Sequence, residues 1–144
     1  MKKFLLMVAV ATLALIGPAA SKHPIIHVIR DDSGGVLLQY IGKYVVWDNN
    51  GDSVRIEGAC YSACTLVLGT VKFSRVCATR EAVFGFHSAS LHLRDEYSAE
   101  GTAVMWAFYS PNVRAKLSEY GWETPSYHPD LIMIRAQEIV RPCK

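Results

Sequence analysis

The sequence has few charged residues and no dense cluster of one sign. Asp, Glu, Lys and Arg make up 19% of the 144 residues, with 15 basic against 13 acidic side chains. No basic run with interleaved aromatic residues occurs, so nothing in the composition indicates a nucleic-acid partner. Internal repeats, low-complexity tracts and linker-like segments are also lacking, which argues against repeat and multidomain architectures.

No apolar run reaches the length of about 20 residues that a comfortable membrane span needs. The longest, at positions 4–16, follows a basic start and precedes small residues at 17–21. This order is typical of a secretory signal, so we expect residues 1–21 to be removed on export; an uncleaved anchor is the alternative. The mature protein, residues 22–144, would be one domain in the periplasm or outside the cell, without a stable membrane span.

Cysteine is scarce, and no C-x-x-C pair occurs. The four cysteines are Cys60, Cys64, Cys77 and Cys143. In a small exported domain they are expected to form two disulfides, and the spacing does not match a zinc site. Spacing leaves three pairings open. We favour Cys64–Cys77 with Cys60–Cys143, which would tie the C-terminus to the middle of the chain. No metal or cofactor is predicted.

The secondary-structure signals alternate between β-branched runs and helical spacing. Two strand–helix units in succession predict a parallel sheet with βα crossovers. The predicted fold class is therefore α/β, with a small, mainly parallel sheet and helices covering its faces. Strands are predicted at 25–29, 54–56, 72–77 and 83–86, helices at 36–47, 63–68, 102–109 and 110–120, and a polar surface excursion at 88–100.

Ser62 occupies the corner between a predicted strand and a buried helix. Gly58 is expected to end the strand, and the apolar residues 63–68 follow the serine. A serine at such a corner either caps the helix or is a nucleophile beside free backbone N–H groups. Gly34-Gly35 ends the first predicted strand, and His87 ends a later one. Because the carboxyl ends of parallel strands meet at one edge, these three features should converge there.

The order and spacing of these features resemble the Clp protease/crotonase superfamily, in particular its peptidase branch. Ser33-Gly34-Gly35 is similar to the family's Ser-Pro-Gly-Gly loop, without the proline. Residues 58–63 are similar to its Gly-x-Ala-x-Ser elbow, and residues 84–87 to the strand that carries its histidine. The two cysteines at the elbow depart from the cytosolic peptidases. The chain also lacks parts that build the family's rings, so no oligomeric state is predicted.

The resemblance implies a serine hydrolase site. It implies that Ser62 is the nucleophile, that His87 is the general base, and that the N–H groups of Gly35 and Ala63 form an oxyanion hole. Asp130 falls in a place comparable to the family's third catalytic residue, although it could instead be a helix cap. Asp95 and Glu96 lie nearer to His87 in the sequence and are alternatives, if the polar excursion folds back.

The expected function is an exported peptidase or esterase acting on a peptide or small acyl substrate. The alternative is a non-catalytic binding module that keeps the Clp-like fold, with His87 bonded to backbone and Ser62 as a cap. A crotonase-like acyl-CoA enzyme is disfavoured, because acyl-CoA substrates are intracellular and no basic cluster for the adenine nucleotide is visible.

Overall fold

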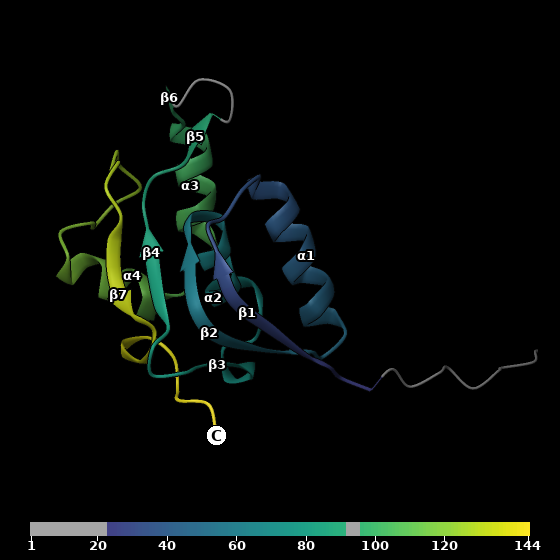
Figure 1. Cartoon of the computed structure of the whole chain (residues 1–144). Helices are drawn as coiled ribbons and strands as arrows, with labels where there is room; N and C mark the ends of the chain where they lie inside the picture. The colour runs from purple at the N-terminus through teal and green to yellow at the C-terminus, as the bar shows by residue number, and fades with distance from the viewer. Residues whose placement is uncertain (1–22, 92–95) are drawn as a thin grey trace, which may run out of the picture.

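The computed structural model describes residues 23–91 and 96–144. The predicted signal peptide, residues 1–21, lies outside these ranges. The described chain is an α/β fold with a five-stranded sheet and a separate two-stranded one (Figure 1). The elements are β1 (Ile26–Asp32), α1 (Leu37–Asn49), β2 (Ser53–Tyr61), η1 (Ser62–Leu66), α2 (Val67–Thr70), η2 (Phe73–Arg75), β3 (Val76–Ala78), β4 (Val83–Phe86), β5 (Ser90–Leu91), β6 (Glu96–Tyr97), α3 (Ala99–Phe108), α4 (Pro111–Glu119), β7 (Ile132–Arg135) and η3 (Ala136–Glu138).

The central strand of the main sheet is β2, and most of the pairing is parallel. Strand β1 runs parallel to β2 along one side, and β3 and β4 pair parallel with successive halves of β2 on the other. Strand β7 closes the edge antiparallel to β4. The predicted strands at 54–56 and 83–86 therefore share one sheet, as expected.

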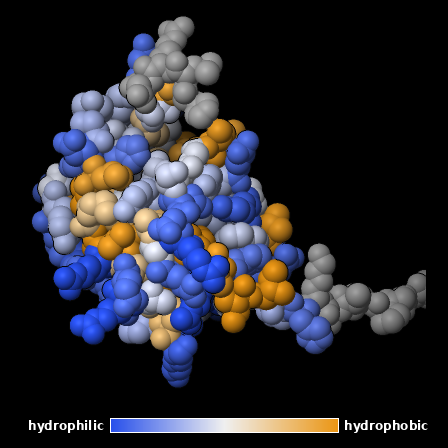
Figure 2. Space-filling view, in the orientation of Figure 1, coloured by the Kyte–Doolittle hydropathy of each residue, from blue (hydrophilic) through white to orange (hydrophobic). Residues whose placement is uncertain are grey.

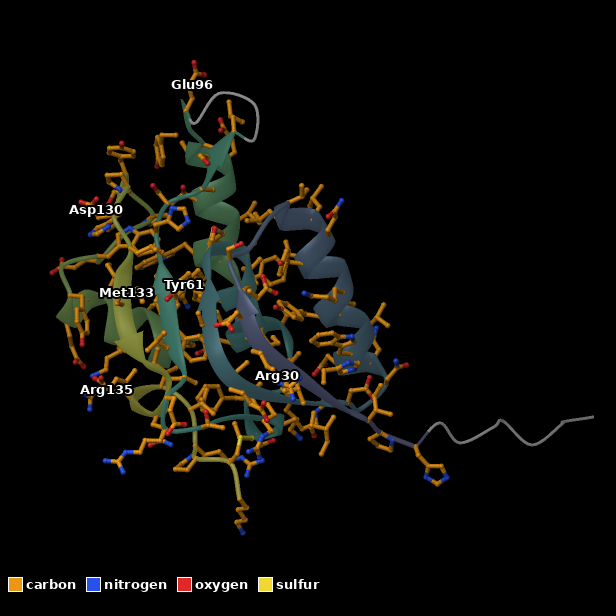
Figure 3. The ribbon with its side chains drawn as sticks, viewed as in Figure 1. Arg30, Tyr61, Glu96, Asp130, Met133 and Arg135 are labelled. Carbon is orange, nitrogen blue, oxygen red and sulfur yellow. A yellow bond between two sulfur atoms is a disulfide. The ribbon has the colours of Figure 1, made fainter. Side chains whose placement is uncertain are left out.

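The helices gather on one face of this sheet. In Figure 1, α2, α3 and α4 lie behind the strands and α1 runs alongside β1, whereas no labelled helix crosses the face toward the viewer. Exposure alternates along β7, where Met133 is 45% exposed between buried Ile132 and Ile134. Helices were expected on both faces of the sheet, but the helices of the described residues cover only one face. The open face carries mixed polar and apolar side chains, as Figures 2 and 3 show.

The core lies between the sheet and the helices. Its largest fully buried side chains come from both layers, as burial of a sheet face against helices requires. They include Val54, Ile56, Phe84, Phe86 and Ile134 of the sheet and Tyr44, Leu66, Leu68, Met105, Tyr109, Leu117 and Trp122 from the helical side.

Strand β2 is longer than its β-branched run, and the prediction that Gly58 ends it was wrong. The strand continues through Gly58 to Tyr61. A Cβ at Gly58 would lie 1.6 Å from the carbonyl oxygen of Arg30, where β1 shifts register against β2. Glycine is required here because the two backbones approach closely, and not because the chain turns.

Other predicted elements were confirmed with shifted bounds. Helix α1 covers most of the predicted 36–47, and α4 begins at Pro111 with the Ser110 hydroxyl accepting from Val113 N–H. The predicted strand at 72–77 is reduced to β3, preceded by the turn η2. Strand β7 was not predicted, because residues 131–134 are all apolar, and so short an apolar run does not distinguish a strand from a buried helix.

Candidate active site

Ser62 lies at the junction of β2 and η1 with an unusual backbone. Its φ is +54°, and among the described residues it is the one non-glycine residue in the left-handed region. Holding an L-residue there costs about 1–3 kcal/mol, and such residues persist where the surrounding structure fixes them. The strand–helix corner expected from the sequence is therefore present, and it is strained.

The hydroxyl of Ser62 does not cap the helix that follows. The N-cap residue of η1 is Tyr61, and no side chain accepts from the first amides of η1. Among the described residues, no hydrogen bond involves the Ser62 hydroxyl. The interpretation of Ser62 as a helix cap is therefore wrong, and Ser62 is one of the residues that line the cavity described below.

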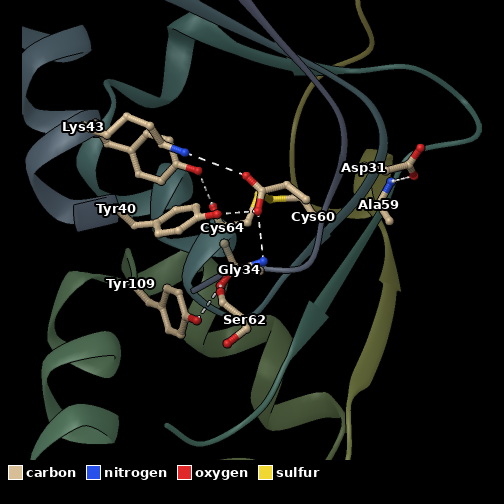
Figure 4. The surroundings of a disulfide bond; sticks show 12 residues. Asp31, Gly34, Tyr40, Lys43, Ala59, Cys60, Ser62, Cys64 and Tyr109 are labelled. Atoms are coloured by element: carbon tan, nitrogen blue, oxygen red, sulfur yellow. Dashed lines mark hydrogen bonds and ion pairs between the residues drawn. A yellow bond between two sulfur atoms is a disulfide. The ribbon is translucent and has the colours of Figure 1, made fainter. Parts of the chain in front are cut away.

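Several groups fix the elbow from outside. A disulfide joins Cys60 to Cys64, so it brackets Ser62 directly (Figure 4). The Thr65 hydroxyl donates to the Ser62 carbonyl at 2.6 Å and lies 2.6 Å from the buried Tyr109 hydroxyl, which can donate to it in turn. The buried Tyr44 hydroxyl donates to the Cys64 carbonyl at 3.0 Å. Together these contacts define the strained turn.

The expected cysteine pairing was wrong, although all four cysteines are in disulfides. The second bridge joins Cys77 to Cys143. The C-terminal segment runs beside β3, where Cys143 N–H donates to the Ala78 carbonyl and Ala78 N–H donates to the Arg141 carbonyl. The C-terminus is thus tied to β3 and not to the elbow, because the sharp turn already brings the Cα atoms of Cys60 and Cys64 within 5.3 Å.

The Gly-Gly loop packs directly against the elbow. Gly34 has φ +86°, and a Cβ there would lie 2.8 Å from the Cβ of Ser62 and 2.9 Å from the nitrogen of Ala63. The Gly35 amide donates to no other described residue, and Ala63 is in the first turn of η1, where amides lack partners within the helix. The structure therefore brings the Gly-Gly loop to the elbow, with Gly34 in contact with Ser62 and Ala63 and Gly35 next to it in the loop.

His87 follows β4 at the same end of the sheet. Cys60 and Tyr61 pair with Phe84 and Gly85, so the ends of β2 and β4 are level. The His87 side chain is half-buried. Burial lowers the pKa of its imidazole below the ordinary 6.5, and the nearby charge of His128 lowers it further. No hydrogen bond joins His87 to Ser62 among the described residues.

Asp130 lies beside the end of β4 but is not joined to His87. It precedes β7, whose Ile132 pairs with Phe86, so it caps no helix. Its side chain is exposed, and its carbonyl oxygen lies 3.0 Å from Nδ1 of His128. Within the described part of the chain, its carboxylate has no hydrogen-bond partner.

Asp95 and Glu96 are the two alternatives for the third catalytic residue, and neither is placed beside His87. Asp95 lies outside the described residues. Glu96 is exposed in β6, and Figure 3 places it at the far tip of the molecule, above α3.

A cavity of about 590 Å³ opens beside the elbow. Its walls come from the Gly-Gly loop, the start of α1, Ser62, the segment entering β5, and α3. His87, Ala63 and Asp130 are not among the lining residues. The lining is mostly apolar, with several serines and one carboxylate: Ser33, Gly34, Gly35, Val36, Leu37, Leu38, Ser62, Ala89, Ser90, Leu91, Ser98, Glu100, Gly101, Val104 and Met105.

Sequence reasoning missed the residues that support the site. Tyr44, Thr65 and Tyr109 hold the elbow, and His128 lies near His87. Helical spacing placed Tyr44 on the buried side of its helix, but the partner of its hydroxyl depends on tertiary structure. Thr65 three residues after Ser62 is a local signal for a bond to the Ser62 carbonyl.

The described residues contain no cluster of three or more metal-ligating side chains, and none of the described helices has the length and apolar character needed to cross a membrane. Comparison of the sequence with models of protein families and with curated proteins, and of the structure with solved structures, gave no match.

Proposed function

We propose that this protein is an exported serine hydrolase, a peptidase or an esterase, built on a core like that of the Clp protease/crotonase superfamily. The observation that carries the proposal is the left-handed backbone of Ser62, a residue that caps no helix and lines a mostly apolar cavity. Strained, over-determined residues cluster at active sites. Two disulfides in so short a chain agree with export to an oxidising compartment.

The proposed reaction is acyl transfer through a covalent intermediate. Ser62 Oγ attacks the substrate carbonyl while His87 takes the hydroxyl proton, and His87 then gives that proton to the leaving alkoxide or amine. The oxyanion of the tetrahedral intermediate accepts hydrogen bonds from the N–H groups of Gly35 and Ala63. Water activated by His87 then hydrolyses the acyl-enzyme and restores Ser62.

The lowered pKa of His87 suits this role. A general base must be neutral to accept a proton, and burial keeps this imidazole neutral at pH values where a free histidine is partly charged. Ser62 and His87 form no hydrogen bond. Catalytic hydrogen bonds often reach their full strength only when substrate binds.

The cavity favours substrates with an apolar acyl group. Leu37, Leu38, Val104 and Met105 supply most of an apolar wall beside Ser62. Burying an apolar group there removes it from water, at about 25 cal/mol per Å². An ester or peptide with an apolar residue on the acyl side is the expected substrate.

A second candidate function is a binding module that uses the same cavity without chemistry. The observations that favour it are the missing Ser62–His87 hydrogen bond and the isolated carboxylate of Asp130. In this case the cavity would bind an apolar peptide segment without cleaving it.

Labelling with a fluorophosphonate probe tests the proposal. The probe phosphonylates activated serines, and peptide mapping by mass spectrometry identifies the modified residue. We expect one adduct, on Ser62 of the wild-type protein, and none in Ser62→Ala. Ser90→Ala is the matched control, because Ser90 lines the same cavity but lies on β5.

An unlabelled wild-type protein, or an adduct on Ser90 in place of Ser62, would contradict the hydrolase proposal. If the unlabelled protein still binds an apolar peptide, by calorimetry, the binding-module function is correct.

A further inference from the structure

Asp32 is the last residue of β1, immediately before the Gly-Gly loop. Its Oδ1 accepts a hydrogen bond from the Gly34 amide at 2.9 Å and another from the Tyr40 hydroxyl at 2.5 Å. Its other oxygen lies 3.7 Å from Nζ of Lys43 (Figure 4). The carboxylate is 21% exposed, so it is shielded but not isolated from water.

One face of α1 joins this carboxylate to the elbow. Tyr40, Lys43 and Tyr44 follow the i, i+3, i+4 spacing that places side chains together on a helix. The Lys43 ammonium lies 3.9 Å from the centre of the Tyr40 ring and 4.7 Å from that of Tyr44. The Tyr44 hydroxyl donates to the Cys64 carbonyl, so the same face contacts both the loop and the elbow.

The geometry of the loop depends on the bond from Gly34 to Asp32. Gly34 has a left-handed backbone and lies against Ser62 and Ala63 with no room for a side chain. Glycine adopts positive and negative φ about equally readily, so a contact is needed to select one conformation. The Asp32 carboxylate fixes the amide of Gly34, and this fixes the peptide that follows, whose N–H belongs to Gly35.

We propose that Asp32, held by Tyr40 and Lys43, is a positioning residue that orients the Gly35 N–H toward the oxyanion formed at Ser62. It contacts no reacting atom and acts only through the loop. This inference depends on the proposed hydrolase function. It explains why a short helix face carries two tyrosines and a lysine around one carboxylate at the end of β1.

The test compares Asp32→Ala, Asp32→Asn and Tyr40→Phe in hydrolysis of p-nitrophenyl butyrate and in the rate of fluorophosphonate labelling. Loss of one oxyanion donor lowers kcat by about 100-fold or more, so we expect a loss of that order in Asp32→Ala. KM should stay unchanged, because the oxyanion exists only in the transition state. Asp32→Asn retains an acceptor for Gly34 and should recover most of the rate; Tyr40→Phe should lose a few-fold.

Asp52→Ala is the matched control. Asp52 also accepts from a backbone amide, that of Ile25, and from a side chain, that of His27, but at the opposite end of the same strands. All rates are measured well below the unfolding midpoint of each variant. Asp52→Ala should react at the wild-type rate.

Wild-type rates in Asp32→Ala, or equal losses in Asp32→Ala and Asp32→Asn, would overturn the positioning role. If Asp32→Ala does not fold, the test uses Asp32→Asn, Asp32→Gln and Tyr40→Phe. Wild-type kcat in all three variants would then overturn the positioning role. A wild-type protein that neither labels nor hydrolyses the ester refutes the proposed function itself, which is a different result.

Discussion

The two ends of β1 and β2 hold polar clusters of opposite character. At the amino end, His27 Nε2 lies 2.8 Å from a carboxylate oxygen of the buried Asp52, and the His27 ring stacks on Trp47 at 3.8 Å. The other Asp52 oxygen accepts from the Ile25 amide. Both carboxylate oxygens of Asp52 have a partner, and the cluster holds the start of β1 to the turn after α1.

At the carboxyl end, the carboxylate of Asp32 also has partners, but the hydroxyl of Ser62 has none among the described residues. Ser62 has a left-handed backbone, and its hydroxyl has no described partner. The cavity beside it, about 590 Å³, is twice the size of the one at the amino end, about 290 Å³. The cluster around Asp52 stabilises the fold, whereas the strained backbone of Ser62 destabilises it. We therefore infer that the carboxyl end, with Ser62, is the catalytic one.

Replacing the histidine at each end should have the largest and most unequal effects. His87→Ala removes the proposed general base, which contributes about 10²–10⁴-fold to rate, so ester hydrolysis should fall by about 10³-fold. His27→Ala should lower stability and leave the rate per folded molecule unchanged. The measurement is kcat at a temperature where both variants are folded. Equal losses of kcat in the two variants would remove the distinction between the ends.

Removing the two disulfides one at a time should separate stability from activity. The bridges close loops with sequence separations of 4 and 66 residues. Chain entropy predicts that Cys60→Ala/Cys64→Ala costs about 2 kcal/mol and Cys77→Ala/Cys143→Ala about 4 kcal/mol of unfolding free energy. Labelling of Ser62 should slow at least 10-fold in the first variant only, because that bridge defines the elbow.

Denaturant titration and labelling rates measure the two quantities. A slower labelling rate in Cys77→Ala/Cys143→Ala, with an unchanged rate in the other pair, would contradict the role of the elbow bridge.

The pairing of these cysteines illustrates what the sequence does not determine. The βα order and the α4 cap at Ser110 were predicted from local spacing, and the shared sheet of residues 54–56 and 83–86 from the parallel topology that this order implies. The pairing depends on how sharply the chain turns at Ser62. It also depends on where the C-terminus ends in space, and neither is a local property.

The same limit applies to the site. The meeting of Gly34 with Ser62 at one edge was predicted from the parallel order of strands. The left-handed φ of Ser62 and the bond from Asp32 to Tyr40 were not, since each depends on tertiary packing. Asp130 was assigned only through the resemblance. It precedes β7, beside the end of β4, and its carboxylate has no hydrogen-bond partner among the described residues.

The acid side of the pH–rate profile should respond to His128. Burial first, and the charge of His128 second, lower the pKa of His87 below 6.5. Activity should therefore rise with pH through a midpoint below that value. In His128→Gln the second cause is removed, so the pKa of His87 rises and the acid limb moves to higher pH. If the acid limb of the pH–rate profile does not move, or moves to lower pH, His128 does not lower the pKa of His87.

The amino-end cluster should show its own pH dependence, in stability and not in rate. The hydrogen bond from His27 is the largest cause that lowers the pKa of the Asp52 carboxyl below 3.8, followed by that from the Ile25 amide. A carboxyl with a lowered folded-state pKa stabilises the fold above its ordinary pKa and loses this contribution as pH falls through the lowered value. The stability difference between wild type and Asp52→Asn should therefore shrink below about pH 4, as followed by thermal unfolding. A constant difference down to pH 2 would contradict this.

The most direct test of a strained nucleophile is to remove its hydroxyl with and without its strain. Ser62→Ala and Ser62→Gly both lack the hydroxyl, but only glycine adopts a left-handed backbone freely. We predict that neither variant is labelled by a fluorophosphonate and that Ser62→Gly is more stable than Ser62→Ala by about 1 kcal/mol. At Ser53, in extended β2, the order should reverse, with alanine more stable than glycine. Labelling that survives in either Ser62 variant, or a glycine at 62 less stable than alanine, would contradict the central claim.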